Sequence, residues 1–286
     1  MPSLIDLRRR IRSVRSTQQL TKAMKMVSAA RLRRAQDRVL AARPYAAMFG
    51  QVFSRVAGAV ARDERLDTHP LLARRGENRI LLVLLTADRG LAGAFNTNLI
   101  KASQHFLEEH AGAAIELVAV GRKGRDFHRK RKAAILGELV GITQKVQHSD
   151  AVNIARQVIA HFQSAQADAV YLLYNEFKRA LSQKLAVVRI LPVTLPEEAE
   201  RLDYIYEQPP MALLEGLLAR YVEMAIYQAL LESSAAEFAA RMTAMDAATS
   251  NAGEMIEKLT LFMNRVRQAS ITREIIEVVS GAGAQG

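Results

Sequence analysis

One pattern of apolar positions dominates the last third of the chain. Mostly apolar or small residues recur in alternating steps of three and four from Leu214 to Val266, without a slip. A repeat averaging 3.5 residues keeps one narrow stripe of a helix facing a partner helix, whereas a helix on a globular core shows a broader stripe of period 3.6. The pattern therefore predicts a long coiled-coil helix that needs an equally long partner.

The predicted partner lies at the other end of the chain. The same alternation runs from Leu4 to Val60, although it is polar between Gln18 and Ser28. Because about 150 residues separate the two seams, and both inner ends must meet the segment between them, the helices are expected to pair antiparallel. Leu4 then falls opposite residue 266, where the C-terminal seam ends.

Beyond that point the C-terminal helix is predicted to continue alone. Apolar residues follow without forming a single stripe: Ile271, Ile275, Ile276, Val278 and Val279. At about 1.5 Å of rise per residue, the unpaired end would extend on the order of 20 Å. We expect such an apolar helix end to need an external sleeve.

Two local signals modify the N-terminal helix. Ser3 and Asp6 resemble a capping box at its start, with Asp in place of the usual Glu. Pro44 is expected to kink or interrupt the helix near Arg43, because proline lacks the N–H and its ring clashes with the preceding turn. The heptad phase survives Pro44, so one element is predicted. Residues 63–76 lose the apolar period and are interpreted as a linker.

The middle of the chain alternates strand and helix patterns. The segment 80–86 is a continuous apolar run, typical of a strand buried on both faces of a parallel sheet. Further segments follow in this order: helix 96–109, strand 115–121, short basic helix 124–132, apolar stretch 135–142, helix 150–163, and a strand pair at 169–177 and 184–191. This alternation predicts an α/β layer domain with right-handed crossovers.

Composition and charge narrow the class of protein. Of the 286 residues, 50% are hydrophobic and 24% charged, and no apolar run approaches the ~18 residues of a membrane span, so a soluble, cytoplasmic chain is expected. There is no cysteine, which excludes disulfides and thiol chemistry. The net charge is +11, and residues 1–43 carry twelve Lys or Arg against Asp6 and Asp37, a net +10. The first helix is therefore predicted to face an acidic protein surface or nucleic acid.

No pattern for catalysis or cofactor binding is present. The turn from Asp88 to Gly93 follows a strand and precedes a helix, but it matches neither G-x-G-x-x-G nor G-x-x-x-x-G-K-[ST], so phosphate binding is not predicted there. The six histidines are interpreted as single residues in loops or on helix surfaces, which favours no metal site. No G-x-S-x-G elbow organises a triad. We therefore expect no catalytic residue, no cofactor and no metal.

Three segments carry a family resemblance. Residues 11–34, IRSVRSTQQLTKAMKMVSAARLRR, and residues 238–282, FAARMTAMDAATSNAGEMIEKLTLFMNRVRQASITREIIEVVSGA, resemble the two terminal helices of the γ subunit of F-type ATP synthases. The internal TADRGLAGAFN, residues 86–96, is similar to that family's α/β domain. The similarity covers essentially the whole chain in the right order.

The resemblance implies a fold, a function and a set of partners. The fold would be a long antiparallel coiled coil of N-terminal residues 1–62 and C-terminal residues 209–286, with a Rossmann-like α/β domain, residues 63–208, inserted between them. The function would be that of a non-catalytic central rotor shaft. Its coil would turn inside a hexamer of α and β subunits, and its α/β domain would bind the ε subunit and the membrane ring of c subunits, with one copy per complex. Such a chain would be peripheral to the cytoplasmic face of a bacterial inner membrane and would couple proton flow to ATP synthesis.

The same resemblance assigns partner-contact residues. Arg241, Arg267 and Gln268 would be directional catches on the C-terminal helix. Met24, with its basic neighbours Lys22 and Lys25, would meet an acidic loop of the β subunit. Tyr204 and Glu207 would contact the polar loops of the c ring.

Two other classes of protein stay open on the residues alone. The basic N-terminal helix also suits a coiled-coil scaffold that binds DNA or RNA, although an apolar single-helix end offers nothing to nucleic acid. A nucleotide-binding α/β enzyme would need a ligand at the turn from Asp88 to Gly93.

Overall fold

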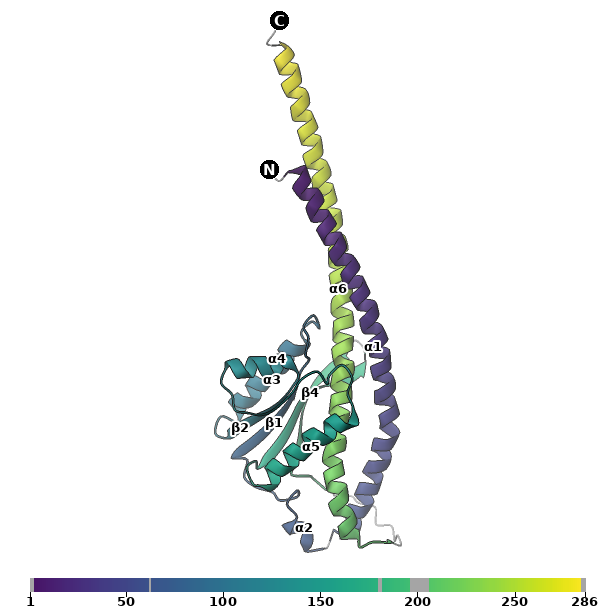
Figure 1. Ribbon diagram of the computed structural model, residues 1–286, viewed down its shortest axis with the longest axis vertical. Coiled ribbons are helices and arrows are strands. Elements are labelled where there is room, and N and C mark those ends of the chain that lie inside the picture. The colour runs from purple at the N-terminus through teal and green to yellow at the C-terminus, as the bar shows by residue number, and fades with distance from the viewer. Residues whose placement is uncertain (1–2, 62, 180–181, 196–205, 284–286) are drawn as a thin grey trace. The chain divides into compact units, whose positions relative to one another are not determined.

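The computed structural model describes residues 3–61, 63–179, 182–195 and 206–283 (Figure 1). The elements in chain order are α1 (Leu4–Ala59), α2 (Arg65–Thr68), β1 (Arg79–Leu85), α3 (Phe95–Glu109), β2 (Ala114–Val120), α4 (Arg122–Lys130), β3 (Ile135–Leu139), α5 (His148–Gln163), β4 (Ala169–Arg179), β5 (Ser182–Leu191) and α6 (Pro210–Gly283). The predicted α/β fold with long helices at both ends is confirmed. The boundaries at residues 62 and 208 stay a prediction.

The chain forms two compact units, and α1 and α6 contribute to both. The terminal unit consists of residues 1–28 and 241–286, and the central unit of residues 29–240. None of the helices within the described ranges is long and apolar enough to cross a membrane.

Helix α1 begins at the predicted cap and passes Pro44 without a break. The Asp6 amide donates to Ser3 Oγ at 3.1 Å, and Ser3 Oγ donates to the Asp6 carboxylate at 2.9 Å. Pro44 lies inside the helix, so the alternative of an interruption near Arg43 is wrong. Packing explains the continuity, because α1 buries apolar residues on both sides of the proline, such as Val39 and Phe53. The ring of Phe53 stacks on that of Tyr221 of α6, with centroids 4.9 Å apart.

In the terminal unit the two helices pair antiparallel, in the predicted register. Lys25 Nζ lies 2.5 Å from Asp246 Oδ1, and the hydroxyls of Thr21 and Thr249 are 2.8 Å apart. One turn further, Gln18 lies against Gly253, where an added Cβ would be 3.1 Å from its amide nitrogen. The partner number on α6 rises as the number on α1 falls, so extending the series places Leu4 opposite residue 266 or 267.

The end of α6 continues alone beyond the N-terminus of α1 (Figure 1). Its apolar side chains there are exposed, from 48% at Ile271 to 72% at Val278. The helix remains regular to Gly283. The predicted unpaired apolar helix end is therefore present within the terminal unit.

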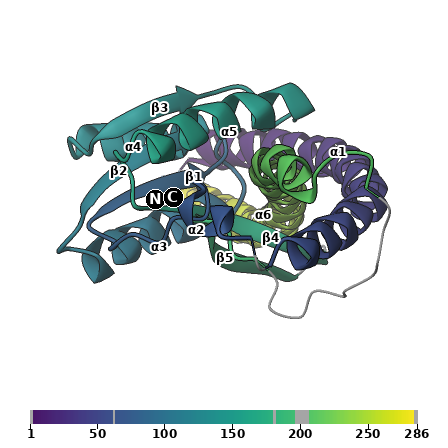
Figure 2. The same ribbon diagram turned by 90° about the horizontal axis from the view of Figure 1, so that it is seen from below.

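The central unit is built on a five-stranded sheet with the order β3-β2-β1-β4-β5. Strands β1 to β4 run parallel, and β5 pairs antiparallel with β4. Helices α3 and α4 contact each other, and α3 and α5 lie on opposite sides of the sheet (Figure 2). The order reverses between β1 and β4, as in doubly wound folds, because the crossover after β3 returns past β1.

Helix α6 has its most buried stretch in the central unit. Every residue from Ala229 to Ala239 is buried, including the polar residues Glu232, Ser233, Ser234 and Glu237. A helix that is buried all round must have neighbours on every side. The neighbours of α6 in this unit include α1, α5 and β4: Tyr221 meets Phe53, Tyr227 meets the His148 ring at 5.3 Å, and Glu232, inside the buried stretch, accepts a backbone hydrogen bond from Phe177.

Candidate partner-contact sites

The predicted site on α1 lies in the terminal unit. Lys22 is exposed, and Met24 is half-buried, with its carbonyl accepting a hydrogen bond from Ser28 Oγ at 2.7 Å. Lys25 pairs with Asp246 of α6. The contact with an acidic partner stays a prediction, and the Asp246 carboxylate already offsets part of the positive charge that Lys25 would offer to it.

The predicted catches on α6 differ in accessibility. Arg267 and Gln268 are exposed on the part of α6 beyond its pairing with α1. Arg241 is only 8% exposed and interacts with other residues of the chain. A planar guanidinium suits bidentate contacts with carboxylates, and Arg267 is free of burial that would prevent them.

The predicted contact with the c ring is only partly described. Tyr204 lies outside the described residues. Glu207 is exposed in the segment that precedes α6, and Tyr206 beside it is half-buried. An exposed carboxylate there can bind a polar loop, so Glu207 keeps its place among the predicted contact residues.

A cationic groove in the central unit was not predicted as a separate site. It has a volume of about 350 Å³, and its lining includes Arg31, Arg34 and Arg38 of α1 together with Lys145. Arg31 Nη1 donates to Gln144 Oε1 at 3.1 Å, and its guanidinium lies 5.8 Å from the ring centroid of Phe238. The sequence could have indicated this groove, because arginines at positions i, i+3 and i+7 share one helix face. The groove presents positive charge toward solvent.

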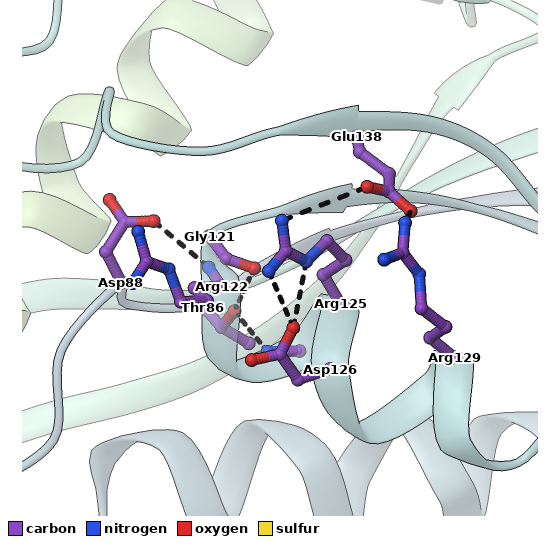
Figure 3. Close-up of polar contacts among 9 residues, drawn as sticks. Thr86, Asp88, Gly121, Arg122, Arg125, Asp126, Arg129 and Glu138 are labelled. Atoms are coloured by element: carbon purple, nitrogen blue, oxygen red, sulfur yellow. Dashed lines mark hydrogen bonds and ion pairs between the residues drawn. The ribbon is translucent and has the colours of Figure 1, made fainter.

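The sheet edge that holds ligands in doubly wound folds is filled by the protein itself. Thr86 Oγ1 lies 3.0 Å from the Val120 carbonyl and accepts from the Gly124 amide at 2.8 Å. The same hydroxyl lies 3.3 Å from the Gly121 carbonyl (Figure 3). Gly121 has φ +89°, and a Cβ there would lie 2.0 Å from the Thr86 carbonyl oxygen, so the close approach of β1 and β2 requires glycine. The Gly124 amide in the first turn of α4 is thus already bonded to Thr86, so it does not serve as a donor to a phosphate.

Asp88 adds a negative charge at the same edge. Its Oδ1 accepts from the Arg122 amide at 3.0 Å (Figure 3). Its Oδ2 accepts from the Gly141 amide at 2.9 Å and from Thr143 Oγ1 at 3.0 Å. The carboxylate therefore connects the end of β1 to the segments that follow β2 and β3. A carboxylate in this position repels a phosphate group, which argues against a nucleotide at the edge.

Helix α4 carries a partly neutralised basic surface. Arg125 binds Asp126 at 2.7 Å, and Arg129 binds Glu138 at 2.6 Å (Figure 3). The hydrogen bond from Arg125 lowers the pKa of the Asp126 carboxyl below its ordinary value. His128 on the same helix is buried, 2.9 Å from Ser103 Oγ, so its expected place on a helix surface is wrong. Burial, aided by the Arg131 charge, lowers the pKa of His128, which keeps its ring neutral at physiological pH.

Comparisons with known proteins agree on one family. A family model described as ATP synthase matches residues 3–284. A protein of Solibacter usitatus named ATP synthase gamma chain is 63% identical over 284 residues, which is 99% of each chain. Its namesake in Pelotomaculum thermopropionicum is 50% identical, again over 99% of each chain.

Solved structures show the same fold. In the mitochondrial ATP synthase of Tetrahymena thermophila, a chain of the structure described as central stalk and c ring matches with a TM-score of 0.60 and 29% identity, covering 80% of this chain and 99% of that one. A chain of the Euglena gracilis mitochondrial enzyme matches with a TM-score of 0.67 at 21% identity, covering 99% of this chain and 94% of that one. The second likeness concerns the fold alone.

Proposed function

The chain belongs to the ATP synthase gamma-chain family, and from that premise we propose that it is the central rotor shaft of an F-type ATP synthase. It couples proton flow through the c ring to ATP synthesis and hydrolysis in a hexamer of α and β subunits. One copy serves each complex. The chain binds no cofactor and is not catalytic, because its part is to transmit rotation between sites that do the chemistry.

The observation that carries this proposal is the lone apolar end of α6. Ile275, Ile276, Val278 and Val279 are each more than half exposed. Contiguous exposed apolar surface marks an interaction site, and apolar burial is not directional. A shaft that must turn inside a sleeve needs such a contact, because the contact stabilises the helix without fixing one angle.

Polar residues near this end supply directional contacts. Arg267 and Gln268 follow the last paired turn and are exposed. Charge-assisted hydrogen bonds favour one orientation over others, so these residues act as catches between successive angles. Arg241 belongs to the same set, and because its side chain is buried, the chain itself fixes the position from which Arg241 makes contact. Lys22, Met24 and Lys25 meet an acidic loop of the β subunit.

The central unit connects the shaft to the membrane ring. Glu207 and Tyr204 precede α6 and contact polar loops of the c ring, and the α/β domain binds the ε subunit. The chain is then peripheral to the cytoplasmic face of a bacterial inner membrane. The Tetrahymena chain that matches this one comes from a structure described as central stalk and c ring, which supports this placement.

Co-purification tests the proposal. A tagged copy of the chain, expressed in its own cells, should bring down α, β and ε subunits and, from detergent extracts, the c ring. The α and β subunits should remain bound at high salt, because the sleeve contact is apolar. Recovery of nucleic acid without these subunits, with binding that falls steeply as salt rises, would overturn the rotor proposal in favour of a basic scaffold.

A further inference from the structure

The loop of residues 140–147, between β3 and α5, reaches both long helices of the central unit. On the side of the sheet, the loop is bonded to Asp88, whose carboxylate accepts from the Gly141 amide and from Thr143 Oγ1. The same carboxylate accepts from the Arg122 amide. One side chain therefore fixes the loop to the ends of β1 and β2.

At the other end, the loop is bonded to α6 and α1. The Thr143 carbonyl accepts from Ser234 Oγ of α6 at 2.8 Å, and both residues are buried. The neighbouring Gln144 accepts from Arg31 of α1 at 3.1 Å. Thr143 thus donates from its hydroxyl toward the sheet and accepts at its carbonyl from the shaft, so a single residue joins the two.

We propose that this loop is the clasp that locks the α/β domain to the two shaft helices, with Asp88 and Ser234 as positioning residues for the transmission of torque. The proposal rests on the rotor function proposed above. Asp88 holds the loop to the sheet, and Ser234 holds α6 to the loop.

The physical reason is that apolar packing alone resists sliding poorly. Burial of apolar surface depends on area and hardly on angle, whereas a hydrogen bond weakens steeply when its geometry changes. Torque between the shaft and the domain applies a shear force along their interface. Directional bonds resist that load, and the bonds of Thr143 and its neighbours run from the sheet to the helices, with the bond from Ser234 to Thr143 buried.

Two variants open the clasp from opposite ends. In Asp88→Asn the side chain keeps one carbonyl oxygen, whereas the three donors use both carboxylate oxygens, so at least one donor faces an amide NH₂. In Ser234→Ala the Thr143 carbonyl loses its donor. Ser234→Thr keeps the hydroxyl and serves as the rescue.

Matched controls remove the same chemistry elsewhere in the central unit. Asp126→Asn removes a carboxylate that pairs with Arg125 on α4 and does not touch the loop. Ser164→Ala removes a serine hydroxyl that donates to the His161 carbonyl at 3.0 Å, next to the end of α5. Neither contact joins the domain to the shaft.

The readout is the torsional stiffness of the rotor in a complex of α subunits, β subunits and this chain. The chain has no cysteine, so a bead can be attached through Lys130→Cys on α4, an exposed site of the α/β domain. A second attachment, Met48→Cys, reports on the shaft itself, because Met48 is exposed on α1. The width of the angular distribution during pauses in ATP-driven rotation measures the stiffness between hexamer and bead.

We expect a loss of stiffness for the Lys130 bead in Asp88→Asn and Ser234→Ala, and none for the Met48 bead in the same variants. Ser234→Thr, Asp126→Asn and Ser164→Ala should match the parent chain at both positions. An unchanged angular width in Asp88→Asn and Ser234→Ala would overturn the clasp while leaving the rotor function intact. An equal loss of stiffness at both beads would also overturn the clasp, because the lower stiffness would then belong to the shaft. A parent complex that hydrolyses ATP while neither bead turns would instead refute the rotor function.

Discussion

The terminal and central units bury their apolar residues in opposite ways. In the central unit, β1 and the stretch of α6 from Ala229 to Ala239 are almost fully enclosed by the chain itself. In the terminal unit, the last turns of α6 keep a regular helix although their isoleucines and valines face solvent. The difference shows where the chain supplies its own core and where it leaves apolar surface for another molecule to cover.

The largest effect should come from cutting a side chain out of the enclosed core. Leu173→Ala on β4 replaces a side chain with 0% exposure, and such changes cost about 2–5 kcal/mol of unfolding free energy. Ile275→Ala, at 58% exposure, should change it by less than about 0.5 kcal/mol in the isolated chain. Urea unfolding followed by circular dichroism compares the two, and equal losses would show that the end of α6 folds back onto the chain.

The next effect concerns assembly with the partner subunits. Ile275→Lys removes apolar area that the sleeve would bury, which weakens assembly by about 1.5–3 kcal/mol. In the isolated chain the same change should reduce self-association, because an exposed apolar patch is lost. Retention of the chain by the α and β subunits in gel filtration measures the first, and light scattering measures the second. Ile275→Leu is the control, and if it weakens assembly as much as Ile275→Lys, apolar burial does not govern the contact.

A charge added beside the Lys25–Asp246 pair should disturb coupling. Met24→Lys places a new cation between Lys22 and Lys25, and a charge-assisted bond to an acidic loop contributes about 1.5–3 kcal/mol. Such a bond must break at each step, so ATP-driven proton pumping should fall more than ATPase activity, with partial recovery at high salt. Pumping and hydrolysis in membrane vesicles give the comparison. Equal loss in Met24→Leu would show that packing governs the position.

The smallest effect concerns the buried carboxyl group of Glu232. Burial raises its pKa above the ordinary value of 4.5, while a hydrogen bond from Gln228 partly opposes the shift. The ionised form is thus disfavoured in the folded state, so the stability contributed by this group is present below pH 4.5 and is lost as the pH rises through the raised pKa. Glu232→Gln should therefore stabilise the chain at pH 8 and leave it nearly unchanged at pH 4. Urea midpoints at the two pH values test this, and a variant that is less stable than the parent at pH 8 would contradict it.

The long helices and their pairing could be predicted, because the heptad repeat indicates each helix and the segment that connects them aligns their inner ends. Counting threes and fours placed Leu4 opposite residue 266, and the contacts of Thr21 with Thr249 and of Lys25 with Asp246 extend to the same pairing. The alternative of a helix interruption at Pro44 was wrong, because the local rule for proline does not include the packing that holds α1 together on either side.

The sheet order and the clasp could not be predicted. Strand patterns show which residues are buried but not which strands are neighbours, so the reversal between β1 and β4 carries no local signal. β3 gave only an apolar stretch, because Gly137 and Glu138 interrupt it at the sheet edge. Ser234 and Thr143 are 91 residues apart in the chain, and nothing near either residue indicates the other.

Direct observation of rotation tests the central claim that this chain is the shaft. A bead attached through Lys130→Cys in a surface-held complex of α subunits, β subunits and this chain should turn in one direction when ATP is added, with three evenly spaced pauses per turn. Three pauses follow from three α and β pairs around one shaft. A bead that stays still while the same complexes hydrolyse ATP at their full rate would contradict the account.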